Sequence, residues 1–265
     1  MADLHVETLG TGARVVLVHG SGNGAAAWDG QRALAERFTL VIPTRSGYPP
    51  NPPLERIDFE TQADELAPLL DAGAHLVGHS YGGVIAMLAA ARRPERVHSL
   101  AVSEPPAFGI AAGNADVDRF VARLEELFAQ RGLGPGEHFR RFIAIVGVDY
   151  DVPDPLPAEI EAATRASMVE RPPWEAELPL EALRAAPFPK LLVSGRHQPA
   201  FEAVLDVLER RLGAERAVVT GRGHNIPGAS GYNALLESFW SRAQAARADA
   251  RPPDPAALRT AGGAA

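Results

Sequence analysis

The sequence contains no cysteine among its 265 residues. A chain without cysteine forms no disulfide, offers no thiolate to a metal and has no thiol nucleophile, so a nucleophile must be an oxygen or a nitrogen. The chain also lacks an excess of basic residues, because 26 Lys and Arg stand against 33 Asp and Glu, a net charge of −7. Nucleic acid is therefore not an expected partner, since phosphate binding needs clustered positive charge.

Long apolar runs are missing as well. No stretch approaches the ~18–20 uninterrupted apolar residues that a membrane-spanning helix needs. The opening stretch MADLHVETLGTG has neither the basic start nor the apolar core of a secretory signal. We therefore expect a cytoplasmic protein without a membrane contact, a monomer or a homodimer, whose partner is a small-molecule substrate. With 46% hydrophobic and 22% charged residues, the chain is expected to fold.

What the chain does contain is an alternation of short strand-like runs and helical patterns. Such alternation is typical of an α/β protein, in which helices cover both faces of a mostly parallel central sheet. Pro68 is expected to kink one of the helices. The expected strands are 14–19, 38–43, 74–80, 96–104, 189–194 and 215–221, and the expected helices are 25–38, 59–73, 81–95, 200–212 and 231–246.

One long interval, residues 105–187, interrupts the alternation. Its apolar residues recur at helical spacing in 115–131, 136–147 and 157–170, and Pro- and Gly-rich joints separate these segments. The interval predicts an inserted helical cap, because the strand–helix pattern resumes after it. The expected organisation is a core of residues 1–104 and 188–247, a cap of residues 105–187 and a flexible tail of residues 248–265.

The segment GHSYGG, residues 78–83, lies between an expected strand and an expected helix. It matches the G-x-S-x-G nucleophile elbow, in which a sharp strand-to-helix turn exposes a serine. The small residues let neighbouring backbone pass close to a strained position, and the N-terminus of the following helix favours negative charge near the serine. Ser80 is therefore the candidate nucleophile.

A glycine-rich loop, HGSGNG at residues 19–24, follows the first expected strand. This loop and the elbow both follow parallel strands, so they are expected at the same edge of the sheet. Acyl transfer needs two donors that point at the developing oxyanion. The candidates are the backbone N–H groups of Ser21 and Tyr81.

The loop TGRGHNIPG, residues 220–228, follows the last expected strand. It carries His224, which follows Ser80 in the chain. The general base follows the serine in the same order in proteins with a nucleophile elbow, so His224 is the candidate base for Ser80. An isolated loop histidine is often only solvated. Its place after the last strand favours the catalytic interpretation.

Together, HGSGNG, GHSYGG, the helical interval and GRGHNIP resemble the α/β-hydrolase superfamily in content and in order. The resemblance covers nearly the whole chain. It implies an eight-stranded sheet, a serine nucleophile, a histidine base and an acid. The segment before the first expected strand is short, so we expect the first strand of the family to be missing.

The acid is where the sequence departs from the family. The family usually has it as the last residue of Gly-x-x-Asp after the strand at 189–194, and here that residue is Gln198, whose amide carries no charge. Some members have an acid after the preceding strand instead, and Glu104 in the EPP junction corresponds to that position. Glu202 and Asp206 are weaker candidates, because they lie beyond the turn on the expected helix.

Several other residues have an expected role in core packing or in lining the pocket. Core packing is the expected role of the aromatic residues Phe139, Phe142 and Trp174 in the cap, and Trp28 is expected to pack the first helix onto the sheet. No metal and no cofactor are expected, because the histidines lack paired ligand spacing. The candidates for lining the pocket are Asn23, Arg196, His197 and Gln198.

The sequence predicts a serine hydrolase that cleaves a small, largely apolar ester, thioester or lactone through an acyl-enzyme. Two alternatives remain at this point. The same fold also supports non-hydrolytic enzymes, namely lyases, cofactor-free oxygenases and haloperoxidase-like enzymes. The missing acid at Gln198 also fits a ligand-binding protein on a hydrolase scaffold that has lost its activity.

Overall fold

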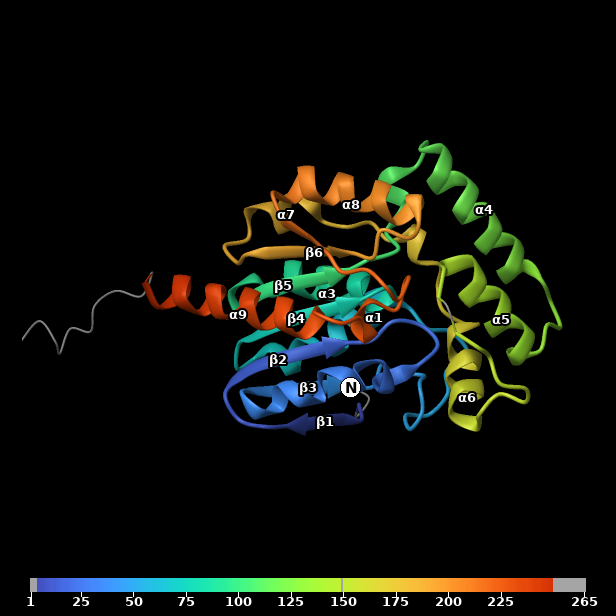
Figure 1. Ribbon diagram of the computed structural model, residues 1–265, viewed down its shortest axis with the longest axis horizontal. Helices are drawn as coiled ribbons and strands as arrows, with labels where there is room; N and C mark the ends of the chain where they lie inside the picture. The colour runs from blue at the N-terminus through green and yellow to red at the C-terminus, as the bar shows by residue number, and fades with distance from the viewer. Residues whose placement is uncertain (1–3, 149, 250–265) are drawn as a thin grey trace, which may run out of the picture.

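A computed structural model describes residues 4–148 and 150–249 of the chain. Seven strands of this described part form one sheet in the order β1-β3-β2-β4-β5-β6-β7, and every neighbouring pair is parallel except β1 and β3 (Figure 1). The strands are β1 (Val6–Leu9), β2 (Ala13–Val18), β3 (Phe38–Pro43), β4 (Ala74–His79), β5 (Val97–Ser103), β6 (Lys190–Ser194) and β7 (Glu215–Val218).

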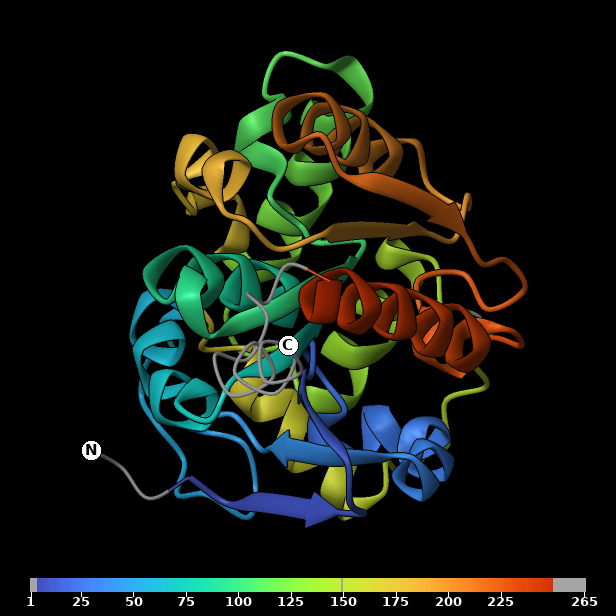
Figure 2. The same ribbon diagram turned by 90° about the vertical axis from the view of Figure 1, so that its left-hand side faces the viewer.

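Helices cover both faces of the sheet. Figure 2 shows η1 (blue) and α9 (red) on one side and α1 and α3 (cyan to teal) on the other. The α-helices are α1 (Phe59–Glu65), α2 (Ala67–Leu70), α3 (Tyr81–Arg92), α4 (Ala115–Ala129), α5 (Pro135–Val146), α6 (Ala158–Ser167), α7 (Leu180–Ala185), α8 (Pro199–Leu212) and α9 (Tyr232–Asp249). The 3-10 helices are η1 (Gly24–Glu36), η2 (Pro94–Arg96), η3 (Phe108–Ala111), η4 (Pro173–Glu175) and η5 (Ile226–Gly228).

The β-branched and leucine-rich strands explain the two-sided core. Successive side chains of a strand point to opposite faces, so Val15 and Leu17 of β2 pack in one hydrophobic cluster while Val16 and Val18 pack in the other. All four are fully buried. Trp28 of η1 belongs to the first of these clusters, as the sequence predicted. The fold class is therefore the expected α/β arrangement with a mostly parallel sheet.

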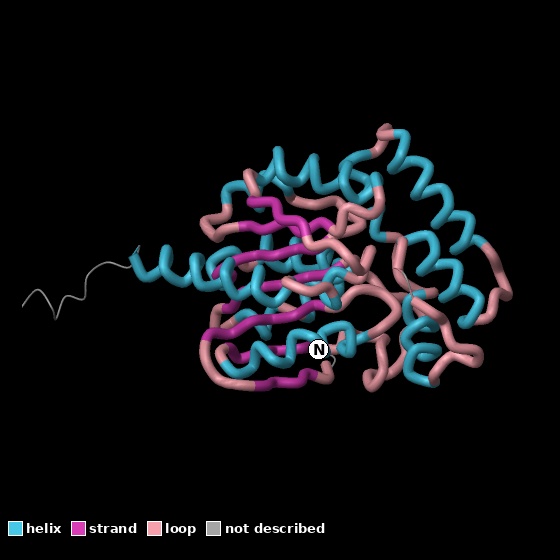
Figure 3. The backbone as a smooth tube through the Cα atoms, in the orientation of Figure 1, coloured by secondary structure: helices cyan, strands magenta, loops and turns pink. Residues whose placement is uncertain are grey.

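Helices α4, α5 and α6 stand beyond the carboxyl ends of the parallel strands, at the right of Figure 1 and again in Figure 3. We call residues 105–187, which contain them, the insert. Helix α4 packs on α8 of the core, and α5 packs between α4 and α6. The insert therefore lies over the edge of the sheet from which the loops that carry Ser80 and His224 emerge.

The expected strands are all present, with small differences at their ends. Strand β1 was not predicted, because its four residues form a half-buried edge strand with two polar side chains. The described sheet thus has one strand fewer than the family resemblance implies. The sequence also predicted α-helix at 25–38, where the structure has the more tightly wound η1.

The expected helix over residues 59–73 is divided. It ends at Glu65 and resumes at Ala67, and Pro68 occupies the first turn of the second piece. Proline removes a backbone donor and clashes with the preceding turn, so this break is the kink that the sequence predicted. Residues 250–265, most of the expected flexible tail, lie outside the described residues. In the described ranges no helix has the length and apolarity that crossing a bilayer requires.

Candidate active site

Ser80 lies at the turn between β4 and α3, with φ 53° and ψ −128°. This left-handed backbone is unfavourable for a residue with a side chain, so the surrounding structure must hold it. A Cβ on Gly78 would lie 2.4 Å from the carbonyl oxygen of Gly82, and a Cβ on Gly82 would lie 2.3 Å from that of Val18. The elbow therefore requires glycine at both positions for steric reasons.

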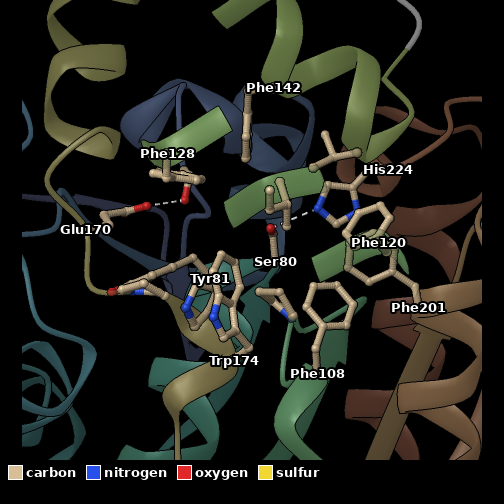
Figure 4. A pocket seen from close by; sticks show the side chains of 16 residues that line it. Ser80, Tyr81, Phe108, Phe120, Phe128, Phe142, Glu170, Trp174, Phe201 and His224 are labelled. Atoms are coloured by element: carbon tan, nitrogen blue, oxygen red, sulfur yellow. Dashed lines mark hydrogen bonds between the residues drawn. The ribbon is translucent and has the colours of Figure 1, made fainter. Parts of the chain in front are cut away.

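The structure brings Ser80, His224 and Glu104 together, although 144 residues separate the first two in the sequence. Ser80 Oγ lies 2.8 Å from His224 Nε2, and Glu104 Oε2 lies 2.7 Å from His224 Nδ1 (Figure 4 shows Ser80 and His224). The carboxylate only accepts, so the Nδ1–H of His224 donates to it and Nε2 accepts from the serine hydroxyl. This is the arrangement of a nucleophile, a base and an acid.

The Glu104 carboxylate is fully buried at the end of β5, where its backbone has φ 42°. Its other oxygen, Oε1, accepts a 2.7 Å hydrogen bond from the backbone N–H of Gly195 and lies 3.3 Å from His197 Nδ1. Burial alone would raise the pKa of Glu104, but its interactions with His197 and His224 outweigh burial and lower the pKa to about 2. The carboxylate is therefore ionised at neutral pH.

His79, the residue before Ser80, contacts the backbone of His224. Its Nε2–H donates to the backbone carbonyl of His224 at 2.7 Å. Burial lowers the pKa of His79 to about 3, so the ring is neutral. The ring of Phe201 stacks on that of His224 with 4.4 Å between centroids. Local sequence gave no signal for either contact, because both join segments that are remote along the chain.

The two candidate oxyanion donors lie beside the nucleophile. Tyr81 is the first residue of α3, so its N–H has no acceptor within the helix. The loop that carries Ser21 is packed against the nucleophile, since a Cβ on Gly20 would lie 2.9 Å from the Cβ of Ser80. Ser21 also lines the same cavity as Ser80 and Tyr81. The structure thus places both residues beside Ser80, and their role as oxyanion donors stays a prediction.

A buried polar network from the insert holds the Ser21 loop. Glu170 accepts from Ser21 Oγ and from Arg45 Nη2, each at 2.5 Å, and from the hydroxyl of Tyr48 at 2.7 Å. Burial would lower the pKa of Arg45, but the charge and hydrogen bond of Glu170, together with Tyr48 and Tyr81, outweigh burial and raise it. Sequence reasoning missed this network, because its members are far apart and belong to no motif.

An apolar cavity extends from Ser80 between the core and the insert (Figure 4). Its empty volume is about 470 Å³. The sequence predicted core packing for Phe142 and Trp174, and both pack as partly buried side chains against the main hydrophobic cluster. Because the insert lies over the sheet edge, the two rings also form part of the cavity wall, which the sequence did not predict. The aromatic residues in the wall are Tyr81, Phe108, Phe120, Phe128, Phe142, Trp174 and Phe201.

A second, wider cavity meets the first at Ser80 and His224. Asn23 lines it, as the sequence predicted, and so does Phe139, for which core packing was expected. Its polar wall is formed by Asn23, Asp29, Glu159, Arg222 and Asn225. Ser80 and His224 therefore lie where the apolar cavity joins the wider, partly polar cavity.

The turn 196–198 borders a different groove, although His197 itself approaches Glu104. Arg196, His197 and Gln198 border a groove formed with α8 and the start of the insert, and they line neither cavity that contains Ser80. The reason is local, because Arg196 has φ 51° and Gln198 is the N-cap residue of α8, so the turn folds back onto that helix. The prediction that these three residues line the pocket is therefore corrected.

The weaker acid candidates are engaged away from the base. Glu202 bonds to Ser194 and to Arg216, and Asp206 pairs with Arg216. Among residues 4–148 and 150–249, the cluster that offers metal-ligand geometry is Glu104, His197 and His224, with one atom of each within 4.8 Å of the others. An ion there would displace the hydrogen bond between Glu104 and His224, so the donor set fits a proton relay better than a metal centre.

Comparison with known proteins finds named esterases and lipases among the relatives of this chain. A pimeloyl-(acyl-carrier protein) methyl ester esterase of Chromobacterium violaceum is 42% identical over 108 residues, which cover 40% of this chain and 42% of that protein. The chain thus matches less than half the length of such esterases. Lipase LipV of Mycobacterium tuberculosis is 28% identical over 247 residues, which cover 85% of this chain and 92% of the lipase.

The fold also has solved counterparts. The crystal structure of ALR0039, a putative alpha/beta hydrolase from Nostoc, superposes with a TM-score of 0.71 at 19% identity, covering 89% of this chain and 93% of that one. At this identity the likeness concerns the fold alone. Residues 15–257 match the sequence model of the alpha/beta hydrolase family. The chain belongs to the alpha/beta hydrolase family.

Proposed function

We propose that this protein is a serine hydrolase that cleaves a small, largely apolar ester, thioester or lactone through an acyl-enzyme on Ser80. The observation that carries the proposal is the continuous hydrogen-bond path from Ser80 Oγ through the His224 ring to Glu104, at 2.8 and 2.7 Å. The Ser80 end of this path lines an apolar cavity. The named esterase and lipase relatives support ester bonds as the general substrate class.

In the acylation step, Ser80 Oγ attacks the substrate carbonyl carbon while its proton passes to His224 Nε2. The negative charge that develops on the carbonyl oxygen is held by the N–H groups of Ser21 and Tyr81. The bond to the leaving group then breaks, and His224 returns the proton to the departing oxygen or sulfur. Glu104 keeps the proton on Nδ1 of His224 and stabilises the imidazolium between the two transfers.

Deacylation repeats the steps with water as the nucleophile. His224 takes a proton from water, the hydroxyl attacks the acyl carbon, and the proton returns to Ser80 Oγ as the carboxylic acid leaves. The insert limits the access of bulk water to the cavity in both steps. The substrate and one water molecule balance the reaction: ester and water give acid and alcohol, and Ser80 and His224 return to their starting states.

The two cavities suggest how the substrate is divided. The enclosed cavity presents aromatic rings to one side of the scissile bond, so it suits an apolar chain or ring. The wider cavity has Asn23, Arg222 and Asn225 in its wall and suits the more polar part. This division favours an ester with one apolar and one polar component.

The alternative of an inactive binding scaffold depended on the missing acid at position 198. The carboxylate of Glu104, 2.7 Å from His224 Nδ1, removes the reason for that alternative. Within the part of the chain that the structure describes, no specific contact favours a lyase, an oxygenase or a haloperoxidase-like enzyme over a hydrolase.

A fluorophosphonate probe with intact-mass detection tests the proposal. We expect one covalent adduct on the wild-type protein and none on Ser80→Ala, because only an activated serine is phosphonylated at neutral pH. Release of acid and alcohol from p-nitrophenyl butyrate should disappear in the same variant. A folded wild-type protein that is neither labelled nor active on esters would refute the proposal.

A further inference from the structure

His197 lies beside the candidate triad, by which we mean Ser80, His224 and Glu104. It lines neither of the two cavities that contain Ser80. Its Nδ1 is 3.3 Å from Glu104 Oε1, and its Nε2 is 2.9 Å from the backbone carbonyl oxygen of Val146, the last residue of α5. Its ring is largely buried, with 14% of the side chain exposed. One imidazole therefore spans the triad acid and the end of an insert helix.

Both atoms that face this ring are acceptors. A backbone carbonyl oxygen never donates, and an ionised carboxylate never donates either. Nδ1 approaches Oε1 at ion-pair distance and makes no aligned hydrogen bond, so it is the charge of the carboxylate that favours a proton there. The two neighbours together favour a proton on each ring nitrogen. Neutral histidine has only one. With the proton on Nε2, the lone pair of Nδ1 would face Glu104, and with the proton on Nδ1, the lone pair of Nε2 would face Val146.

We propose that His197 is an imidazolium that positions Glu104 and ties the triad to the insert. It is a positioning residue, since it contacts the acid and not the reacting atoms. This inference rests on the proposed function, in which Glu104 orients His224. The charged His197 ring contacts Oε1 of Glu104, so Oε2 remains free to accept from His224. Its positive charge also balances the negative charge of the buried carboxylate.

The surroundings favour a charged ring. Val146 O belongs to the C-terminal turn of α5, where the partial negative charge of the helix favours a cation. Glu202 of α8 adds a second negative charge near the ring, and its effect is in the same direction. The His224 ring lies 5.9 Å away between centroids. Burial would lower the pKa of His197, but the interaction with Glu104 and the other contacts outweigh burial and raise it.

The insert is packed so closely here that the contact cannot simply relax. A Cβ on Gly147 would lie 2.6 Å from His197 Cδ2, and a Cβ on Gly223 would lie 1.9 Å from the carbonyl oxygen of Gly147. That same oxygen accepts from the backbone N–H of His224 at 3.1 Å. Loss of the His197 proton therefore costs a contact either to the acid or to the insert.

The sign of the pH dependence follows from the raised pKa. A histidine whose folded-state pKa is raised contributes stability that is fully present below its unfolded pKa and is lost as the pH rises through the folded pKa. We therefore expect both the extra stability and the orientation of Glu104 to decline on the alkaline side. Turnover should show an alkaline limb that belongs to His197.

Protein labelled with ¹⁵N in its histidines tests the charge directly. Long-range ¹H–¹⁵N spectra of the wild type at pH 7 should contain one histidine with two protonated ring nitrogens that is missing from His197→Gln. Gln198→Ala, a change at the next position in the same turn, should keep it. A His197 signal with one unprotonated nitrogen at pH 7 would overturn the proposal.

The second measurement is the pH profile of kcat for p-nitrophenyl butyrate. His197→Gln keeps one donor but has no titrating ring, so we expect kcat about tenfold lower at pH 7, a modest share of what hydrogen bonds to charged groups contribute, and no alkaline limb. The same limb in wild type and His197→Gln would overturn the positioning role. If the protein proves not to be a hydrolase, the spectra and the pH dependence of the melting temperature, compared between these two proteins, still decide the charge.

Discussion

At the scale of single residues, the role of Glu104 is the easiest to test by mutation, because it depends on one hydrogen bond to His224. Its Oε2 holds the His224 ring in the tautomer that accepts from Ser80. An amide in its place can present an N–H to Nδ1 and so favour the opposite tautomer. The orientation of the base then no longer matches the nucleophile.

We expect Glu104→Gln to lower kcat for p-nitrophenyl butyrate by roughly 10³–10⁴-fold, the loss typical of a triad acid replaced by its amide, with a smaller change in KM. Circular dichroism checks that the variant is folded. Gln198→Asp is the matched control. Because residue 198 faces the groove along α8, the added carboxylate should neither change the wild-type rate nor rescue Glu104→Gln. Normal turnover by Glu104→Gln would remove Glu104 from the triad.

Much of the candidate site could be predicted at this scale, and the reason is local. Ser80 and His224 lie in short motifs at strand ends, and the topology of a parallel sheet brings such ends together. Glu104 was predicted from its position in the chain. The roles of Glu170 and His197 were not predicted, because each depends on a contact between the core and the insert that no local pattern encodes.

At the scale of elements, the insert is attached to the core by a buried ion pair. The Arg45 guanidinium follows β3 and the Glu170 carboxylate follows α6, and both side chains are almost fully buried. Backbone hydrogen bonds between Ile57 and the residues on either side of Glu170 join the same two regions. Glu170 also accepts from Ser21 Oγ, so the attachment supports the loop that carries this candidate oxyanion donor.

Removing one partner of this pair leaves the other charge buried. We expect Glu170→Gln and Arg45→Met each to lower the free energy of unfolding in urea by about 3–5 kcal/mol, the usual cost of breaking a buried pair. The double variant should be more stable than the sum of the two losses predicts. Glu215→Gln, which breaks the exposed pair with Arg242, is the control and should cost less than about 1 kcal/mol. Strict additivity of the two losses would contradict a coupled pair.

The elements themselves were predicted where their patterns are strong. Strands β2 to β6 are rich in apolar residues and fit burial on both faces, and α3 and α8 have clear helical spacing. Strand β1 could not be predicted, since an edge strand gains its structure from pairing with β3 rather than from its own sequence. The winding of η1 likewise depends on tertiary contacts, such as those of Gln31 with Pro227 and Asn233.

At the scale of the whole molecule, the apolar cavity exists only because the insert closes over the sheet. Its wall combines Phe120 and Phe128 of α4 with Phe201 of α8. Aromatic rings from the insert and from the core therefore limit the length of the apolar substrate chain that the cavity can hold. Neither part of the chain predicts this length by itself, so substrate size is a property of the assembled molecule.

We expect kcat/KM for a series of p-nitrophenyl esters to rise by about fourfold with each added methylene while the chain still enters the cavity, which corresponds to ~0.8 kcal/mol per buried methylene. Longer chains should then react more slowly. Phe128→Ala should move this optimum to a longer chain, whereas Leu54→Ala, at an exposed position outside the cavity, should leave it in place. An unchanged optimum in Phe128→Ala would show that the chain binds elsewhere.

The position of Glu104 has a consequence for protein engineering. Glu104 is the last residue of the core before the insert begins, so the residue proposed to orient the base is also the residue from which the insert departs. In an enzyme with its acid at position 198, the insert could be exchanged without touching the triad. Here a graft, a deletion or a recombination crossover near this junction would disturb catalysis directly, so chimeras with new substrate ranges should keep residues 103–106 from this chain.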